Sequence, residues 1–518
     1  MKSIGFVFFL IIPISINAQQ VIHGKKELTA EQSMRTDCDR RVFYEIFIRS
    51  FYDSNGDGIG DLNGITAKLD YMQQLGIGGL WLTPFNPSPS YHKYDVTDYY
   101  SVDPEYGTLD DFKKLVSEAH RRDILVLMDL VVNHTSEQHP WFKAAITNDP
   151  KYREYYVWEK NPAATREGGW YKDRDSTIYA ADSTKYYAYF WRGMPDLNFD
   201  NPEVRREIIK TGLWWLKETK IDGYRLDAAQ HVYDPDNPEK NIVWWKEFTD
   251  ALKQQKPDVI TVGECWNTYN RVAQYLPALS GAFNFQLSWV ILRGLQTERG
   301  DSIGPMLTLI RKEYEKYAPD FIDPIFLSNH DNNRIMSDLK NNEYKAKLVA
   351  CIYLTLPGTP FIYYGEEIGM KGMKPDNLIR EPFLWDAKGR DPHQTSWEKS
   401  TYSTDDFMKP LSAQLQDTSS FYFHYKTLID FRKKNDAITS QDFIAADLNN
   451  SQLLAYVRGD GNEALLVIHN LSEELVEFSL PEDFKQYAGV IFSSPEKLLP
   501  DVRNLILRPF STIILRRG

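Results

Sequence analysis

Short apolar segments alternate with amphipathic segments along the chain from residue 43 onward. The apolar segments, which we expect to be strands, are FYEIFI, GGLWLTP, ILVLMDLVV, IDGYRLDAA, VITVGECW, GAFNFQLS, PIFLSNHD and TPFIYYGEE. Helical periodicity lies between most of them, as in DDFKKLVSEAHRRD and EVRREIIKTGLWWLKETK. Eight such strand–helix units predict an α/β fold, a (β/α)8 TIM barrel with its functional groups at the C-terminal ends of the strands.

Two regions depart from this alternation. Residues 135–195, after the third strand, are dense in Tyr and Trp and predict an inserted B subdomain. From residue 436 the pattern becomes short alternating strands such as LLAYVRG and EALLVIHNL, which predict a C-terminal antiparallel β domain, expected to be a β-sandwich. The barrel is then formed by residues 19–134 and 196–435, and the C-terminal domain by 436–518.

The first residues have the pattern of a secretory signal peptide. One basic residue precedes the apolar run IGFVFFLIIPISI, and Ala18 gives a small residue before a cut, so residues 1–18 are expected to be removed. The mature protein is then exported, to the periplasm or the medium. Three cysteines, Cys38, Cys265 and Cys351, predict no disulfide framework.

The overall negative charge of the chain bears on which kinds of molecule it can bind. A formal net charge of -12 argues against nucleic acid or an anionic membrane as the partner, and no second apolar run of spanning length follows the signal peptide. We expect a monomer.

Charged side chains stand where the predicted strands end. In GYRLDAAQH, alternation puts Arg225 and Asp227 on the barrel face of the fourth strand, so the Arg is expected to hold the carboxylate ionised. A structural ion pair is the alternative. In VGECW, Glu264 lies between an apolar strand and Trp266, and desolvation is expected to raise its pKa toward that of a general acid.

Two further strand ends add polar groups to the same rim. The third strand ends in DLVVNH and the seventh in SNHD; they contribute Asp129, Asn133, His134, His330 and Asp331. Paired carboxyl groups flanking a sugar–sugar bond hydrolyse glycosides, and a retaining enzyme needs them about 5–5.5 Å apart. Neighbouring strands are about 4.8 Å apart, so the ends of the fourth and fifth strands can provide that gap.

The segment DSNGDGIGD presents oxygen ligands with the spacing of a calcium loop. An EF-hand is excluded, because its twelfth position is Gly64 instead of Glu and the upstream segment is a strand. The expected ligands of a structural Ca²⁺ are Asp53, Asn55, Asp57, Asp61 and the main chain near Ile59. The alternative is a polar surface turn.

The segments DLVVNH, GYRLDAAQH, GECW and FLSNHD, in this order, resemble the four core motifs of the α-amylase family, glycoside hydrolase family 13. The resemblance covers nearly the whole mature chain. It implies that Asp227 is the nucleophile, Glu264 the general acid/base and Asp331 the transition-state stabiliser. The further residues that it implies at the bound sugar are Tyr94, His134, Arg225, His330, Asp376 and Arg380.

The resemblance also bears on specificity. MPDLN at 194–198 resembles a group intermediate between oligo-1,6-glucosidases and neopullulanases, and Gln230 stands where α-amylases carry Lys. The leading hypothesis is a retaining hydrolase that cleaves α-1,4 bonds of starch or maltooligosaccharides. The alternatives are α-1,6 cleavage of the α-glucosidase or neopullulanase type, a glucanotransferase or trehalose-forming isomerase and, more remotely, a non-catalytic carbohydrate-binding or transporter-associated protein.

Overall fold

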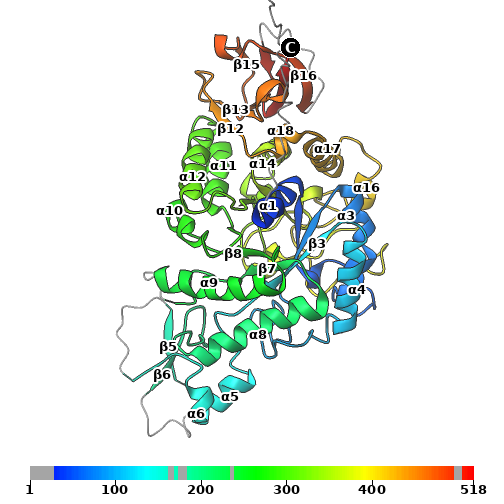
Figure 1. The fold of residues 1–518 in the computed structure, drawn as a ribbon. Coiled ribbons are helices and arrows are strands. Elements are labelled where there is room, and N and C mark those ends of the chain that lie inside the picture. The colour runs from blue at the N-terminus through cyan, green and yellow to red at the C-terminus, as the bar shows by residue number, and fades with distance from the viewer. Residues whose placement is uncertain (1–28, 161–167, 173–183, 234–237, 495–504) are drawn as a thin grey trace, which may run out of the picture.

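The computed structural model describes residues 29–160, 168–172, 184–233, 238–494 and 505–518. The expected signal peptide lies outside these residues. Three regions follow one another along the long axis of the molecule: the C-terminal β domain at one end, the barrel in the middle and the inserted subdomain at the other end (Figure 1). No helix within the described ranges is long and apolar enough to cross a membrane.

An eight-stranded parallel sheet forms the barrel. Its strands, in spatial order, are β10 (Pro324–Ile325), β11 (Thr359–Tyr363), β1 (Phe43–Ile46), β2 (Gly79–Leu82), β3 (Leu125–Leu130), β7 (Gly223–Leu226), β8 (Ile260–Gly263) and β9 (Gly281–Ala282). A parallel bridge between Gly281 and Ile322 brings β9 next to the segment that leads into β10, so the cylinder is nearly closed. The predicted TIM barrel is confirmed.

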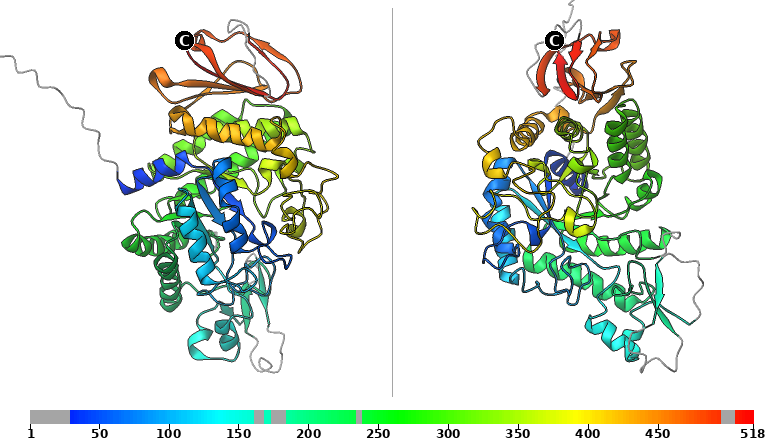
Figure 2. Two further views of the ribbon diagram at one scale, coloured as in Figure 1. Left: turned by 90° about the vertical axis from the view of Figure 1, so that its right-hand side faces the viewer. Right: turned by 180° about the vertical axis from the view of Figure 1, so that it is seen from behind.

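Helices surround this cylinder (Figure 2). They are α1 (Ala30–Arg40), α2 (Leu62–Ala67), α3 (Leu69–Leu75), α4 (Leu109–His120), α8 (Pro202–Thr219), α9 (Pro238–Gln255), α10 (Tyr269–Val272), α11 (Phe285–Thr297), α12 (Ile303–Tyr317), α13 (Ile335–Asp338), α14 (Glu343–Thr355), α15 (Asp376–Ile379), α16 (Leu411–Gln414), α17 (Phe421–Lys434) and α18 (Asp436–Thr439). Helix α8 shows why these segments are helical. Asn201 caps its first turn, Pro202 occupies the first helical position, and Ile208 and Trp215 bury one face.

Two predicted strands are much shorter than expected. Only Gly281 and Ala282 of GAFNFQLS, and Pro324 and Ile325 of PIFLSNHD, are in strands. In the first segment the Asn284 side chain accepts a hydrogen bond from the Leu287 N–H, and this cap starts α11 at Phe285. Apolar and aromatic residues at the start of α11, which has one face buried, have the same local pattern as a strand.

The inserted subdomain contains α5 (Pro140–Ile146), α6 (Pro150–Arg153) and an antiparallel sheet of β4 (Trp158–Glu159), β6 (Lys185–Ala188) and β5 (Gly169–Tyr171). The bridge between His134 and Asp196 brings together the two residues that flank the insertion, and the bridge between Tyr156 and Leu197 pairs its interior with the segment that re-enters the barrel. The segment that follows β6 is therefore held beside the end of β3, at the mouth of the barrel.

The C-terminal domain has a five-stranded antiparallel sheet and a two-stranded one. The first has the order β12 (Phe443–Ala446), β13 (Leu453–Arg458), β14 (Leu465–Asn470), β18 (Ser511–Arg517) and β16 (Tyr487–Ser494); the second pairs β15 (Val476–Phe478) with β17 (Leu505–Leu507). These sheets enclose a separate apolar core that includes Leu466, Ile468 and Leu505. The predicted antiparallel β domain is confirmed.

Candidate active site

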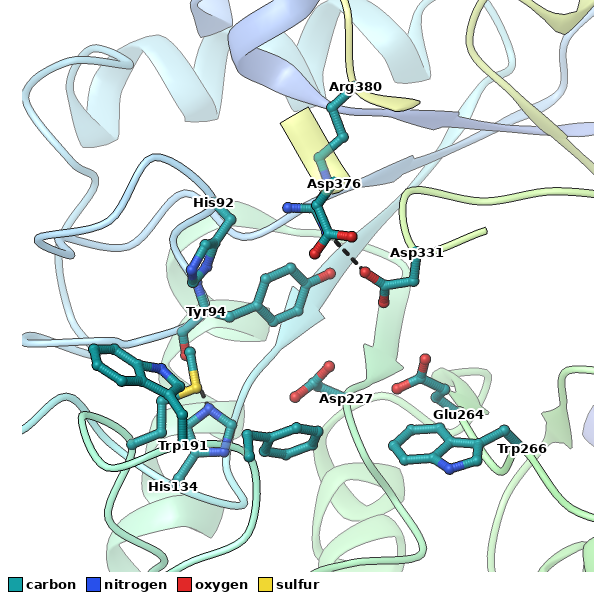
Figure 3. A pocket seen from close by; sticks show the side chains of 12 residues that line it. His92, Tyr94, His134, Trp191, Asp227, Glu264, Trp266, Asp331, Asp376 and Arg380 are labelled. Atoms are coloured by element: carbon teal, nitrogen blue, oxygen red, sulfur yellow. Dashed lines mark hydrogen bonds and ion pairs between the residues drawn. The ribbon is translucent and has the colours of Figure 1, made fainter. Parts of the chain in front are cut away.

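A cavity of about 220 Å³ opens at the C-terminal end of the barrel. Figure 3 shows the carboxyl groups of Asp227, Glu264 and Asp331 converging on it. Its lining residues are His92, Tyr94, His134, Phe190, Trp191, Met194, Asp227, Glu264, Trp266, Asp331, Asp376 and Arg380. Seven of the nine predicted catalytic and sugar-binding residues are in this set, and the other two, Arg225 and His330, contact members of it.

Arg225 connects the acidic groups of three neighbouring strand ends. Its Nη1 lies 2.9 Å from Asp129 Oδ1 and 2.7 Å from Asp227 Oδ1, and its Nη2 lies 2.8 Å from Glu264 Oε2. The register of β3 and β7 pairs Asp129 directly with Arg225. Tyr224 points the other way and donates a hydrogen bond to the Gly212 carbonyl on α8, so the predicted alternation along this strand is confirmed.

Asp227 and Glu264 are both buried beside this guanidinium. Burial raises the pKa of each carboxyl group, and Arg225 lowers it in both cases. The predicted direction is confirmed for Glu264. It is wrong for Asp227, whose pKa rises because desolvation outweighs the neighbouring Arg. Since the two acids repel one another, they titrate as a pair, and the second proton leaves less readily than the first.

Asp331 has a different environment from the other two acids. Its Oδ1 lies 2.7 Å from Arg380 Nη2, and its Oδ2 lies 3.1 Å from His330 Nε2. Burial raises the pKa of Asp331, but His330 and Arg380 outweigh burial and hold that pKa well below its usual range. This carboxylate therefore stays ionised beside the other two acids.

His330 and Tyr94 form one wall of the site. The Tyr94 hydroxyl lies 2.6 Å from His330 Nε2, and the two rings are stacked with centroids 5.3 Å apart. Burial lowers the pKa of His330, but Asp331 and Glu45 raise it to about 10 overall. His330 is therefore a charged donor at neutral pH.

The remaining predicted sugar contacts also line the cavity. His134 Nε2 lies 3.1 Å from the Tyr94 carbonyl, and burial lowers the pKa of His134 to about 4, so this ring is neutral. Asp376 forms ion pairs with Lys374 Nζ at 2.8 Å and Arg380 Nη2 at 3.5 Å.

Sequence reasoning missed three aromatic residues that line the cavity. Phe190 and Trp191, which follow β6 in the inserted subdomain, are 41% and 45% exposed although they are large apolar groups. Trp266, two residues after Glu264, packs against His231 in a tilted arrangement with ring centroids 4.7 Å apart. The aromatic density of STKYYAYFWRGM was the available signal, but nothing local placed this segment at the barrel mouth.

The loop predicted to bind calcium is folded around its own acidic groups. Asp53 is buried, and its two oxygens accept hydrogen bonds from the main-chain N–H groups of Asn55, Gly56 and Gly58. Asp61 caps α2 through the Gly64 N–H.

The donor chemistry of this loop suits a hard cation. Three aspartates and an asparagine are present, and none of the described Lys or Arg side chains forms an ion pair with these aspartates. As placed, however, no three acidic, His or Cys side chains in the described ranges form a ready metal-holding group. The polar-turn alternative accounts for the same hydrogen bonds, so calcium stays a prediction.

A search of protein families matches residues 45–441 to the family described as "Alpha amylase, catalytic domain". The chain belongs to the α-amylase family. Residues 453–514 match a second family, described as "Alpha-amylase SusG C-terminal domain". The matched ranges agree with the barrel and the C-terminal β domain of this α-amylase family member.

Named relatives of this family member differ in their activities. It is 41% identical over 517 residues to "Alpha-amylase 3" of Dictyoglomus thermophilum, and the match covers 99% of this chain and 98% of the relative. It is 33% identical over 436 residues to a "4-alpha-glucanotransferase" of Thermotoga neapolitana, covering 83% and 96% of the two chains. The solved α-amylase from H. orenii is 39% identical, with a TM-score of 0.84 over 92% of this chain and 99% of that one.

These comparisons establish an enzyme of the α-glucan hydrolase and transferase family. They do not assign the bond that is cleaved or the expected intermediate subgroup, which remain predictions.

Proposed function

We propose that the protein is an exported retaining hydrolase that cleaves α-1,4-glucosidic bonds of starch or maltooligosaccharides through a covalent glycosyl–enzyme intermediate. One observation carries the proposal: Arg225 contacts both Asp227 and Glu264, with Asp331 across the same cavity. This arrangement supports two carboxyl groups acting on one glycosidic bond.

In the first step Asp227 attacks the anomeric carbon of the bound glucosyl unit. A bond forms from its carboxylate oxygen to that carbon, the bond to the glycosidic oxygen breaks, and Glu264 gives its proton to the leaving oxygen. The raised pKa of Glu264 favours the protonated form that a general acid needs. Contact between Arg225 and Asp227 at 2.7 Å supports the charge on the nucleophile.

In the second step water attacks the same carbon while Glu264, now ionised, takes its proton. The bond to Asp227 breaks and the nucleophile is restored. Asp331 keeps its negative charge throughout, since His330 and Arg380 both contact it. A fixed negative charge beside an oxocarbenium-like centre stabilises the positive charge that develops there.

The residues that line the cavity orient the substrate. The Tyr94 ring offers a face for a sugar ring, and neutral His134 offers hydrogen bonding without adding charge. Arg380 and Asp376 lie at the same end of the cavity and supply polar contacts for hydroxyl groups.

Calcium and export are parts of the same proposal. Asp53, Asn55, Asp57, Asp61 and the Ile59 main chain would hold a Ca²⁺ that pins the loop after β1, with no part in the chemical step. Export rests on the N-terminal sequence pattern alone.

Reducing-sugar release from maltooligosaccharides, starch and pullulan by the wild type and Asp227→Asn tests the proposal. The wild type should be active and the variant should lose at least about three orders of magnitude in kcat, because an amide is a poor nucleophile and cannot carry the charge. The anomer released first should keep the α configuration. Equal activity of the two proteins, or a β-anomeric product, would refute the assignment.

A second candidate is transfer of the glycosyl unit to another sugar. Trp266 lies beside the general acid Glu264, and the exposed Phe190 lines the same cavity; these aromatic faces favour the binding of an acceptor sugar on the leaving-group side. Products longer than the substrate, formed from maltotriose alone, would favour this activity. If no longer products form at high substrate concentration, hydrolysis is the activity of the protein.

A further inference from the structure

Glu45 is a buried carboxylate inside the barrel, below the cavity. It lies on β1, where it pairs with Trp81 on one side and Tyr363 on the other, and it is only 1% exposed. Its Oε1 accepts two hydrogen bonds from His330, one from ring Nδ1 at 2.6 Å and one from the main-chain N–H at 3.2 Å.

The other ring nitrogen of His330 faces the reaction site. Nε2 lies 3.1 Å from Asp331 Oδ2 and 2.6 Å from the Tyr94 hydroxyl. The imidazole thus has a carboxylate at each of its nitrogens, which favours the doubly protonated ring, because each nitrogen can then donate.

The choice of an acidic side chain at position 45 needs explanation, because burial raises the pKa of Glu45 while the His330 ring lowers it. A glutamine of nearly the same shape could accept both hydrogen bonds without placing a charge inside the barrel, and burying a carboxylate is costly. What the carboxylate adds over the amide is negative charge, and its closest positive partner is the His330 ring. The charged and titratable groups that act on Glu45 or His330 are Tyr94, Arg225, Glu264, Asp331, Tyr363 and Arg380.

We propose that Glu45 is a positioning residue that fixes the His330 ring and keeps it doubly protonated as a donor beside Asp331. The effect of Glu45 on the charge of His330 is independent of the proposed glycosidase function, and only its effect on catalysis rests on that function. Glu45 itself is not among the residues that line the cavity. It acts through His330, which in turn sets the charge and the position of the Asp331 carboxylate.

The charge state of His330 can be measured directly and without substrate. Nitrogen-15 NMR of histidine-labelled full-length protein, with the His330 signal identified by its absence in His330→Gln, should show both ring nitrogens protonated at pH 7.5 in the wild type. Glu45→Gln should lower the titration midpoint of His330 by at least one pH unit. Glu45→Asp, which keeps the charge, should lower it by less than half as much.

A matched control removes a different buried carboxylate nearby. Glu367 accepts hydrogen bonds from Tyr44, the neighbour of Glu45 on β1, and from Tyr71. Glu367→Gln should leave the His330 titration where it is in the wild type. A neutral His330 ring in the wild type at pH 7.5, or equal shifts in Glu45→Gln and Glu45→Asp, would overturn the proposal.

Kinetics test the consequence. The ratio of kcat/KM for Glu45→Gln to that of the wild type should fall at least about twofold between pH 6 and pH 9, mainly through kcat, because a one-unit drop from a pKa of about 10 halves the protonated fraction of His330 at pH 9. The ratio for Glu367→Gln should stay flat. A flat ratio for Glu45→Gln would overturn the positioning role even if the protein folds normally. An inactive wild type would instead refute the proposed function, and the NMR titration would still test the role of Glu45.

Discussion

Replacing Glu366 by Gln should make the protein more stable at alkaline pH and leave it nearly unchanged at acid pH. Glu366 lies just after β11 in a buried site, where the Tyr353 and Tyr425 hydroxyls each donate to its Oε1 at 2.9 Å and the Ser328 hydroxyl donates to Oε2 at 3.2 Å. Burial raises its pKa to about 7, although the three hydroxyl groups oppose this rise.

The sign follows from proton binding. Between about pH 4.5 and 7 the folded protein keeps a proton on Glu366 that the unfolded chain has already lost, so stability falls as the pH rises through this window. The pKa of Glu366 is about 2.5 pH units higher in the folded protein than in the unfolded chain, which corresponds to a loss of about 3 kcal/mol in folding stability. This loss is complete above pH 7. Glutamine never ionises, so the variant avoids this loss.

Apparent melting temperatures of the wild type and Glu366→Gln at pH 5 and pH 8.5 give the measurement. For a cooperative unit of about 400 residues, about 3 kcal/mol corresponds to roughly 4 °C, so the variant should gain roughly 4 °C relative to the wild type between the two pH values. His330 and the other titrating groups are common to both proteins and cancel in this comparison.

Glu463→Gln, at an exposed position in the C-terminal domain, is the control and should show no such gain. The same melting difference between wild type and Glu366→Gln at both pH values would refute the reasoning, because it would mean that Glu366 is already ionised in the folded protein at pH 5.

Three further predictions address the active site, the calcium loop and the barrel. Asp331→Asn should lower kcat by about 10²–10³-fold with a small change in KM, as measured by steady-state kinetics, because it removes a charge used in the transition state; a change in KM alone would contradict this role. Chelation with EDTA should lower the melting temperature of the wild type by several degrees, while the single-turnover rate constant at 25 °C stays within twofold. Asp57→Asn should abolish this response to EDTA, and an unchanged melting temperature of the wild type would count against a bound cation. Gly223→Ala should reduce the yield of folded protein sharply, since an added Cβ would lie 1.9 Å from the Ile260 carbonyl oxygen of the adjacent strand; a normal melting curve would show that β7 can shift.

Local sequence determined much of the architecture and the chemistry. Apolar segments in alternation with amphipathic ones are enough to predict the barrel, because each strand must be buried on both faces and each helix on one. Alternation along GYRLDAAQH likewise placed Arg225 and Tyr224 on opposite faces, as the structure confirms. The acids at the strand ends were found for the same reason: charged residues directly after buried strands are rare without a function.

Only the tertiary structure decided how these groups act on one another. The pKa of Asp227 rises because burial, which depends on the whole cavity, outweighs the adjacent Arg225. Phe190 reaches the site through a subdomain that returns to the barrel mouth, and Glu45 meets His330 across 285 residues of chain. A sequence pattern records which residue types follow one another, whereas desolvation and charge–charge interaction depend on distances that closing the barrel creates.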